Sequence, residues 1–210
     1  MRSYVQVLNK LDEQKTLIEK REKLVILLSG QSDFAHSELS EEQKNLLNHF
    51  KQYGYSVLET GFPYNQEHNF QGCERAGSIR ASIRNIQQFA YSIFSIKYRQ
   101  TLAKHLQPVF NSANIIIICQ SSGLNMLKMA LPYLKINNNA DITIIALGPV
   151  VFCTFKDERF KVFTIKGYKD WVSVFFDKQP VNFWISCNHL DYCQNERVFE
   201  LIDGIFKNED

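Results

Sequence analysis

The stretch ANIIIICQSSGLNML, residues 113–127, decides how the chain is expected to fold. Four consecutive isoleucines, Ile115 to Ile118, are bounded by polar residues, a pattern typical of a short strand buried on both faces of a parallel sheet. Leucines then recur at spacings of three and four from Leu124 to Leu134, which is the period of an amphipathic helix. Because too few residues separate the two patterns for an ordinary loop, we expect a sharp turn at residues 120–122.

This strand, turn and helix carry a serine between small residues and resemble the nucleophile elbow of the α/β-hydrolase superfamily. The family pattern is Gly-x-Ser-x-Gly, whereas this chain has Cys119 at the first glycine position and Gly123 at the second. Cysteine is small enough for a position that the following helix crosses closely. The resemblance implies that Ser121 lies at the tip of the turn with its hydroxyl exposed above the sheet. Taken alone, a serine in this place more often caps the helix.

Two later segments supply the acid and the histidine that the resemblance requires. A predicted strand ends near Gly167 and is followed by Asp170, and the last predicted strand is followed by His189. The order Ser121, Asp170, His189 is the superfamily's order of serine, acid and histidine. Each residue follows the carboxyl end of a predicted strand, where open parallel sheets form their sites. We therefore expect these three residues to form a catalytic triad.

The same resemblance implies an oxyanion hole made of backbone N–H groups. One donor is the N–H of Ser122, and the other comes from the loop after the first buried strand, from Gln31 or Ser32. The family often has His-Gly at that strand end, where this chain has Ser29-Gly30. Gly30 fits the family pattern, and the choice between the two loop donors stays open.

The acid and the histidine each have an alternative interpretation. Asp157 competes with Asp170 for the acid role, and His189 is also placed to bond Asp191, two residues on. The segment from residue 187 to residue 193 has the pattern Cys-x-His-x-x-x-Cys, whose residue types bind zinc. No second half-site accompanies it, so we expect neither a metal nor another cofactor.

Length and composition describe an ordinary globular chain. At 210 residues, the chain is expected to form a single domain over residues 1–210. The net charge is +2, and no basic stripe is interleaved with aromatic residues, so nucleic acid is not an expected partner. Five scattered cysteines argue against a disulfide framework and for a reducing, cytoplasmic location. No stretch approaches the roughly 20 apolar residues of a membrane span.

The rest of the chain alternates between strands and helices. Residues 1–23 fit either a hairpin, which we favour, or a surface helix, and residues 61–78 show no periodicity and predict a long loop suited to a lid. Further strands are expected at residues 24–28, 55–60, 141–148, 160–167 and 181–186, and helices between Ser40 and Gly54, over residues 79–110 and from near Asn195 onward. The alternation predicts an α/β fold with a mostly parallel central sheet and helices on both faces. The resemblance adds that the fold is α/β-hydrolase-like, without a separate cap domain.

The resemblance implies a small serine hydrolase that cleaves a carboxylic ester or thioester, a small-molecule acyl substrate, through an acyl-enzyme. Phe175-Phe176 and Phe183-Trp184 are interpreted as core, and the first pair lies near enough to the acid loop to line an acyl pocket. An acyltransferase would use the same triad. A non-catalytic hydrolase-like protein that binds a partner is a further alternative, motivated by Cys119 and by the unusual Ser29-Gly30. A nucleotide-binding domain is disfavoured because the chain lacks a glycine-rich phosphate loop.

Overall fold

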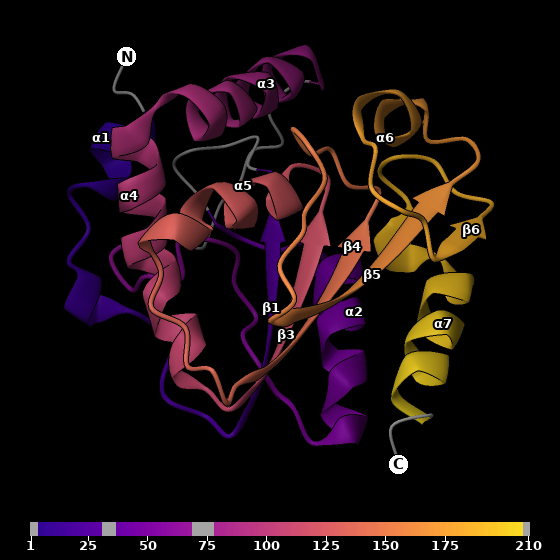
Figure 1. Cartoon of the computed structure of the whole chain (residues 1–210), viewed down its shortest axis with the longest axis horizontal. Helices are drawn as coiled ribbons and strands as arrows, with labels where there is room; N and C mark the ends of the chain where they lie inside the picture. The colour runs from indigo at the N-terminus through magenta and orange to yellow at the C-terminus, as the bar shows by residue number, and fades with distance from the viewer. Residues whose placement is uncertain (1–3, 31–36, 69–77, 208–210) are drawn as a thin grey trace.

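Figure 1 shows the computed structural model, which describes residues 4–30, 37–68 and 78–207 and is built around one sheet. Among these residues, six strands lie in the order β2-β1-β3-β4-β5-β6, and every neighbouring pair is parallel. The strands are β1 (Lys23–Ser29), β2 (Ser56–Val57), β3 (Asn114–Gln120), β4 (Asp141–Leu147), β5 (Phe160–Gly167) and β6 (Phe183–Ile185). The predicted α/β fold with a parallel sheet is confirmed.

The four isoleucines lie in β3, which pairs with β1 on one side and β4 on the other. Ile115 and Ile117 face one apolar cluster, and Ile116 and Ile118 face a second cluster on the other side of the sheet. All four are at most 1% exposed. A strand buried on both faces has to be apolar at every position, which is why the sequence shows a run rather than an alternation.

Helices cover both faces of the sheet, as Figure 1 shows. One face carries α1 (Tyr4–Leu8), α4 (Ile96–Leu106) and α5 (Gly123–Ala130), with α3 (Ser78–Phe94) packed on α4 and α5, and the other carries α2 (Glu41–His49) and α7 (Glu196–Lys207). Helix α6 (Trp171–Phe176) follows the carboxyl end of β5. Short 3-10 segments are η1 (Glu13–Lys15), η2 (Phe50–Tyr53), η3 (Gln107–Asn111), η4 (Leu131–Tyr133) and η5 (Tyr192–Gln194). Within the described ranges, no helix has both the length and the apolar run that a bilayer span requires.

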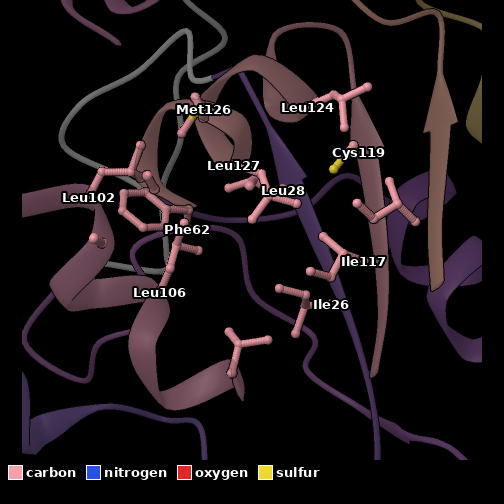
Figure 2. Close-up of a cluster of buried hydrophobic side chains, with 14 of the residues drawn as sticks. Ile26, Leu28, Phe62, Leu102, Leu106, Ile117, Cys119, Leu124, Met126 and Leu127 are labelled. Carbon is pink, nitrogen blue, oxygen red and sulfur yellow. The ribbon is translucent and has the colours of Figure 1, made fainter. Parts of the chain in front are cut away.

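Figure 2 shows part of the first apolar cluster, between α4, α5 and the sheet. The side chains labelled there are Ile26, Leu28, Phe62, Leu102, Leu106, Ile117, Cys119, Leu124, Met126 and Leu127. Each leucine or isoleucine that is fully buried contributes roughly 1.5–3 kcal/mol to stability. Both elements that flank the turn between β3 and α5 therefore contribute side chains to a buried cluster.

The N-terminal hairpin that we favoured is wrong. Residues Tyr4–Leu8 form the short helix α1, and Tyr4 and Leu8 are both fully buried. Residues four apart share one face of a helix, so these two side chains reach the cluster together. In addition, Thr16 forms an isolated antiparallel bridge with Asn65 rather than with its own neighbours.

Two other expected elements differ in length. The helical stretch over residues 79–110 is broken into α3, α4 and η3, because Ser95 leaves the helical conformation and accepts a hydrogen bond from the N–H of Tyr98 as the N-cap of α4. The strand expected at residues 55–60 is reduced to β2, which pairs with β1 alone at the edge of the sheet.

The long loop expected at residues 61–78 is partly described. Phe62 and Tyr64 are buried, and the hydroxyl of Tyr64 donates to the carbonyl of Leu27 at 2.7 Å. This first part is therefore packed against β1 rather than free to act as a lid. Residues 69–77 lie outside the described residues, and Ser78 begins α3.

Candidate active site

Ser121 occupies the turn between β3 and α5 in a backbone conformation that is unusual for serine. Its φ is 54°, in the left-handed region that residues with a side chain seldom adopt. Its N–H donates to the carbonyl of Leu147 at 3.1 Å, and its carbonyl accepts from the N–H of Val150 at 2.9 Å. Contacts with the end of β4 and the loop after it thus hold the turn, and such strain is typical of functional positions.

Two small residues next to this turn, Gly123 and Cys119, lie where neighbouring elements pack closely. A Cβ on Gly123 would overlap the backbone carbonyl of Leu28, so α5 crosses β1 closely enough to require glycine. Cys119 is fully buried in the cluster of Figure 2, and burial raises the pKa of its thiol. It is therefore a neutral packing residue.

The structure brings the three residues expected to form the triad into one hydrogen-bonded chain. Ser121 Oγ lies 2.9 Å from His189 Nε2. His189 Nδ1 lies 2.9 Å from Asp170 Oδ1 and 3.0 Å from Asp170 Oδ2. The three come from the ends of β3, β5 and β6, which are brought together because parallel strands end at the same edge of the sheet. In this arrangement the imidazole is placed to accept the serine proton while the carboxylate faces its other nitrogen.

Asp170 is held in place by donors beyond the histidine. It is the N-cap of α6 and accepts from the N–H of Ser173 at 3.0 Å. The hydroxyl of Tyr192 donates to its other oxygen at 2.7 Å. Burial by itself would raise the pKa of Asp170, but the bonds from His189, Ser173 and Tyr192 hold that pKa below its ordinary value. The carboxyl therefore stays ionised at neutral pH although its side chain is buried.

Tyr192 is the member of this site that sequence reasoning missed. It is fully buried, and its hydroxyl also accepts from the N–H of Gly167 at 2.8 Å. A Cβ on Gly148 would lie 2.5 Å from both Asp170 Oδ2 and the Tyr192 ring, so this glycine, with φ of 49°, leaves room for both groups. The available signal was a tyrosine three residues after His189, in a segment already expected to face the site.

The alternative partners lie elsewhere. Asp157 forms an ion pair with Arg159 at 2.7 Å, and not with His189. Asp191 accepts from Asn188 at 2.7 Å and from Gln194. Among the described residues, no group of three His, Cys, Asp or Glu side chains is arranged to hold a metal ion. Both ring nitrogens of His189 are instead within hydrogen-bond distance of Ser121 and Asp170.

The expected oxyanion hole is described only in part. Ser122 is the N-cap residue of α5, so its backbone lies next to Ser121 at the helix N-terminus. Gln31 and Ser32 lie outside the described residues. Gly30, which precedes them, faces Ser122: a Cβ there would lie 2.5 Å from Ser122 Oγ. The end of β1 therefore does border the turn that carries Ser121.

The interpretation of two aromatic pairs as core is wrong for three of the four residues, whereas Phe183 is partly buried and packs against the second apolar cluster. Phe175 and Phe176 of α6 are 72% and 69% exposed, and Trp184 is 44% exposed. Their apolar character resembled a buried segment, but they lie on the outer surface next to the acid loop. Since both phenylalanines face outward, they do not line an enclosed acyl pocket.

No family model matches the chain, and no curated protein matches it either. Among solved structures, the chain is similar to a protein of unknown function from Agrobacterium tumefaciens that is described as a candidate alpha/beta hydrolase. The two share 13% sequence identity with a TM-score of 0.45, over 93% of this chain and 87% of the other.

Proposed function

We propose that the protein is a serine hydrolase that cleaves carboxylic esters or thioesters through an acyl-enzyme on Ser121. The observation that carries this proposal is the chain of hydrogen bonds from Ser121 through His189 to Asp170, with distances of 2.9 Å at both links. A serine hydroxyl is a weak nucleophile until a neighbouring base takes its proton. The three side chains supply a nucleophile, a base and a group that orients the base.

The proposed reaction begins when His189 Nε2 takes the proton of Ser121 Oγ and the oxygen attacks the acyl carbon. The negative charge that develops on the substrate oxygen is stabilised by hydrogen bonds donated by the N–H of Ser122 and by a second donor from the segment after Gly30. His189 then gives its proton to the leaving alcohol or thiol, and the acyl group stays on Ser121. Water attacks the acyl-enzyme by the same steps, which releases the acid and restores the serine.

The left-handed φ of Ser121 supports the role of nucleophile over that of a simple helix cap. A cap residue has extended backbone angles and bonds the N–H two or three residues on. Ser121 instead points its hydroxyl at His189, and the residue at the N-cap of α5 is Ser122, which makes no side-chain cap bond. The left-handed backbone of Ser121 thus directs its hydroxyl at the imidazole of His189. An acyltransferase would use the same acyl-enzyme and pass the acyl group to another acceptor.

Labelling with a fluorophosphonate tests the proposal, because this reagent reacts only with an activated serine. We expect one modified peptide, containing Ser121, in the wild-type protein. Labelling should disappear in Ser121→Ala and His189→Ala and persist in Ser186→Ala, a control at an exposed serine near the end of β6. A folded wild-type protein that takes no label would contradict the proposal and favour the non-catalytic binding protein.

A further inference from the structure

Helix α6 has the reverse of the burial that is usual for a helix on the surface of a globular protein. Its one buried residue is polar, Ser173, whereas Trp171, Phe175 and Phe176 are 66%, 72% and 69% exposed. Surface helices usually turn their apolar face inward. The apolar side of α6 is therefore exposed, while Ser173 and the two flanking residues Asp170 and Asp177 are buried.

Neighbouring side chains extend this exposed apolar surface. Trp171 stacks on Phe175 within α6, and Tyr168 stacks on Trp184 of β6 with ring centroids 5.2 Å apart. The members of the surface, which we call the aromatic platform, are Tyr168, Trp171, Val172, Val174, Phe175, Phe176, Trp184 and Leu190, all at least 38% exposed. Leu190 directly follows His189, and Asp170 directly precedes Trp171. The aromatic platform thus adjoins the serine site.

In the segment that contains α6, the charged side chains are separated by sign between surface and interior. From Gly167 to Asn182, the two lysines on the surface, Lys169 and Lys178, are exposed, while both acids are buried. Asp170 is bonded to His189, and Asp177 pairs with Lys166 at 2.7 Å. This segment therefore presents only positive charge beside its aromatic rings.

Helix α3 adds a second exposed apolar edge to the same end of the molecule. Ile83, Ile86 and Phe94 are 51%, 68% and 81% exposed, and Figure 1 shows both α3 and α6 beyond the ends of the strands at which the arrows point. Asn85 of α3 lies close to Gly30 and to the region of Ser122. Exposed apolar side chains therefore lie on two sides of the Ser121 site.

We propose that the aromatic platform is a docking surface for an anionic lipid membrane. Tryptophan and tyrosine favour the level of the lipid headgroups, and exposed phenylalanine and leucine gain free energy by entering the acyl region. Lys169 and Lys178 flank α6 and are long enough to reach lipid phosphates while the rings between them insert. A second copy of this chain is a poorer occupant, because pairing two such surfaces would bring like charges together.

Docking by this surface would hold the serine site against the membrane. This consequence rests on the proposed hydrolase function, and it predicts that acyl substrates are taken from a lipid surface rather than from bulk water. The docking itself does not depend on Ser121. Membrane binding by Ser121→Ala therefore separates the two proposals, because it should equal that of the wild type whether or not the serine is a nucleophile.

The chain offers a direct optical test, since its two tryptophans, Trp171 and Trp184, both belong to the aromatic platform. We expect the tryptophan emission of the full chain to shift to shorter wavelength when vesicles of equal parts phosphatidylcholine and phosphatidylglycerol are added. Brominated lipids should quench this emission. Vesicles of phosphatidylcholine alone should bind much more weakly.

Vesicle co-flotation extends the test to variants. The double variant Trp171→Ser/Phe175→Ser should lose flotation, and Tyr133→Ser, which changes an exposed aromatic residue on η4, should keep it. Lys169→Gln/Lys178→Gln should weaken binding about 30-fold, because each lysine near an anionic surface contributes about fivefold. Unchanged emission with anionic vesicles would overturn the proposal. The proposal would also be overturned if vesicles were not bound and the platform variants instead abolished self-association or the binding of a protein partner.

Discussion

The two ends of α6 each hold a buried carboxyl, and the two carboxyls differ in what surrounds them. Asp170, at the N-terminal end, accepts hydrogen bonds from His189, Ser173 and Tyr192, which hold its pKa below the ordinary value. Asp177, at the C-terminal end, is dominated by burial, which raises its pKa in spite of its pair with Lys166. Burial acts in the same direction on both carboxyls; the hydrogen bonds outweigh it at Asp170, whereas at Asp177 burial outweighs the pair with Lys166 and the nearby backbone N–H groups.

The largest expected effect separates the roles of the two ends. Asp170→Asn should lower the rate of p-nitrophenyl butyrate hydrolysis by about 10⁴, because an asparagine favours the wrong histidine tautomer. Asp177→Asn should leave that rate unchanged, since Asp177 does not contact His189. Steady-state kinetics on the two purified variants measures both. Equal losses in the two variants would mean that the first effect is a matter of folding rather than of the site.

The second effect concerns stability at the Asp177 end. Lys166→Met removes the cation from a pair whose side chains are 3% and 1% exposed. We expect the free energy of unfolding, measured with urea, to fall by about 3–5 kcal/mol, as it does when one member of a buried pair is left alone. Lys166→Met/Asp177→Asn should recover part of this loss. If the double variant is no better than the single one, the pair is not the cause.

A smaller effect is expected when one of the donors to Asp170 is removed. Tyr192→Phe deletes the hydroxyl that donates to Asp170 and accepts from the N–H of Gly167. The unfolding free energy should fall by about 1–3 kcal/mol, because a buried N–H loses its partner. Carbon NMR titration should show a higher pKa for Asp170 in this variant. An unaltered pKa would show that Tyr192 is not among the groups that keep the carboxyl ionised.

The smallest effect is a difference in pH dependence between the two ends. The pKa of Asp170 is lowered in the folded chain, so its stabilising contribution is present at neutral pH and is lost as the pH falls through that lowered value. The pKa of Asp177 is raised, so its contribution is largest at low pH and is lost as the pH rises through the raised value.

Urea unfolding of the wild type, Asp170→Asn and Asp177→Asn over a series of pH values tests these opposite signs. As the pH falls, the free energy of unfolding of the wild type should decrease relative to that of Asp170→Asn. Relative to that of Asp177→Asn, it should increase. Two differences that move in the same direction would contradict the contrast between the ends of α6.

Much of the site could be predicted from the sequence, because its logic is one of order along the chain. Apolar runs indicated the strands, and a serine, an acid and a histidine each followed one of them. Parallel strands bring such positions to one edge of the sheet, and the resemblance to the α/β-hydrolase order of serine, acid and histidine singled out Ser121, Asp170 and His189 among them.

The remaining features depend on contacts between distant segments that no local pattern records. The hydroxyl of Tyr192 is placed by both Asp170 and Gly167. A lysine such as Lys166 is usually at the surface, but here it is buried in an ion pair with Asp177. An apolar pair such as Phe175-Phe176 is read as core because burial is the usual fate of phenylalanine, and only the structure shows it facing outward.

The most direct test of the central claim is to look for the acyl group on Ser121. The protein should be mixed rapidly with p-nitrophenyl butyrate, quenched in acid and digested for mass spectrometry. We expect a burst of p-nitrophenol equal to the amount of protein and one peptide, containing Ser121, that is heavier by a butyryl group. Turnover without that adduct, together with an unchanged rate in Ser121→Ala, would contradict the claim that Ser121 is the nucleophile.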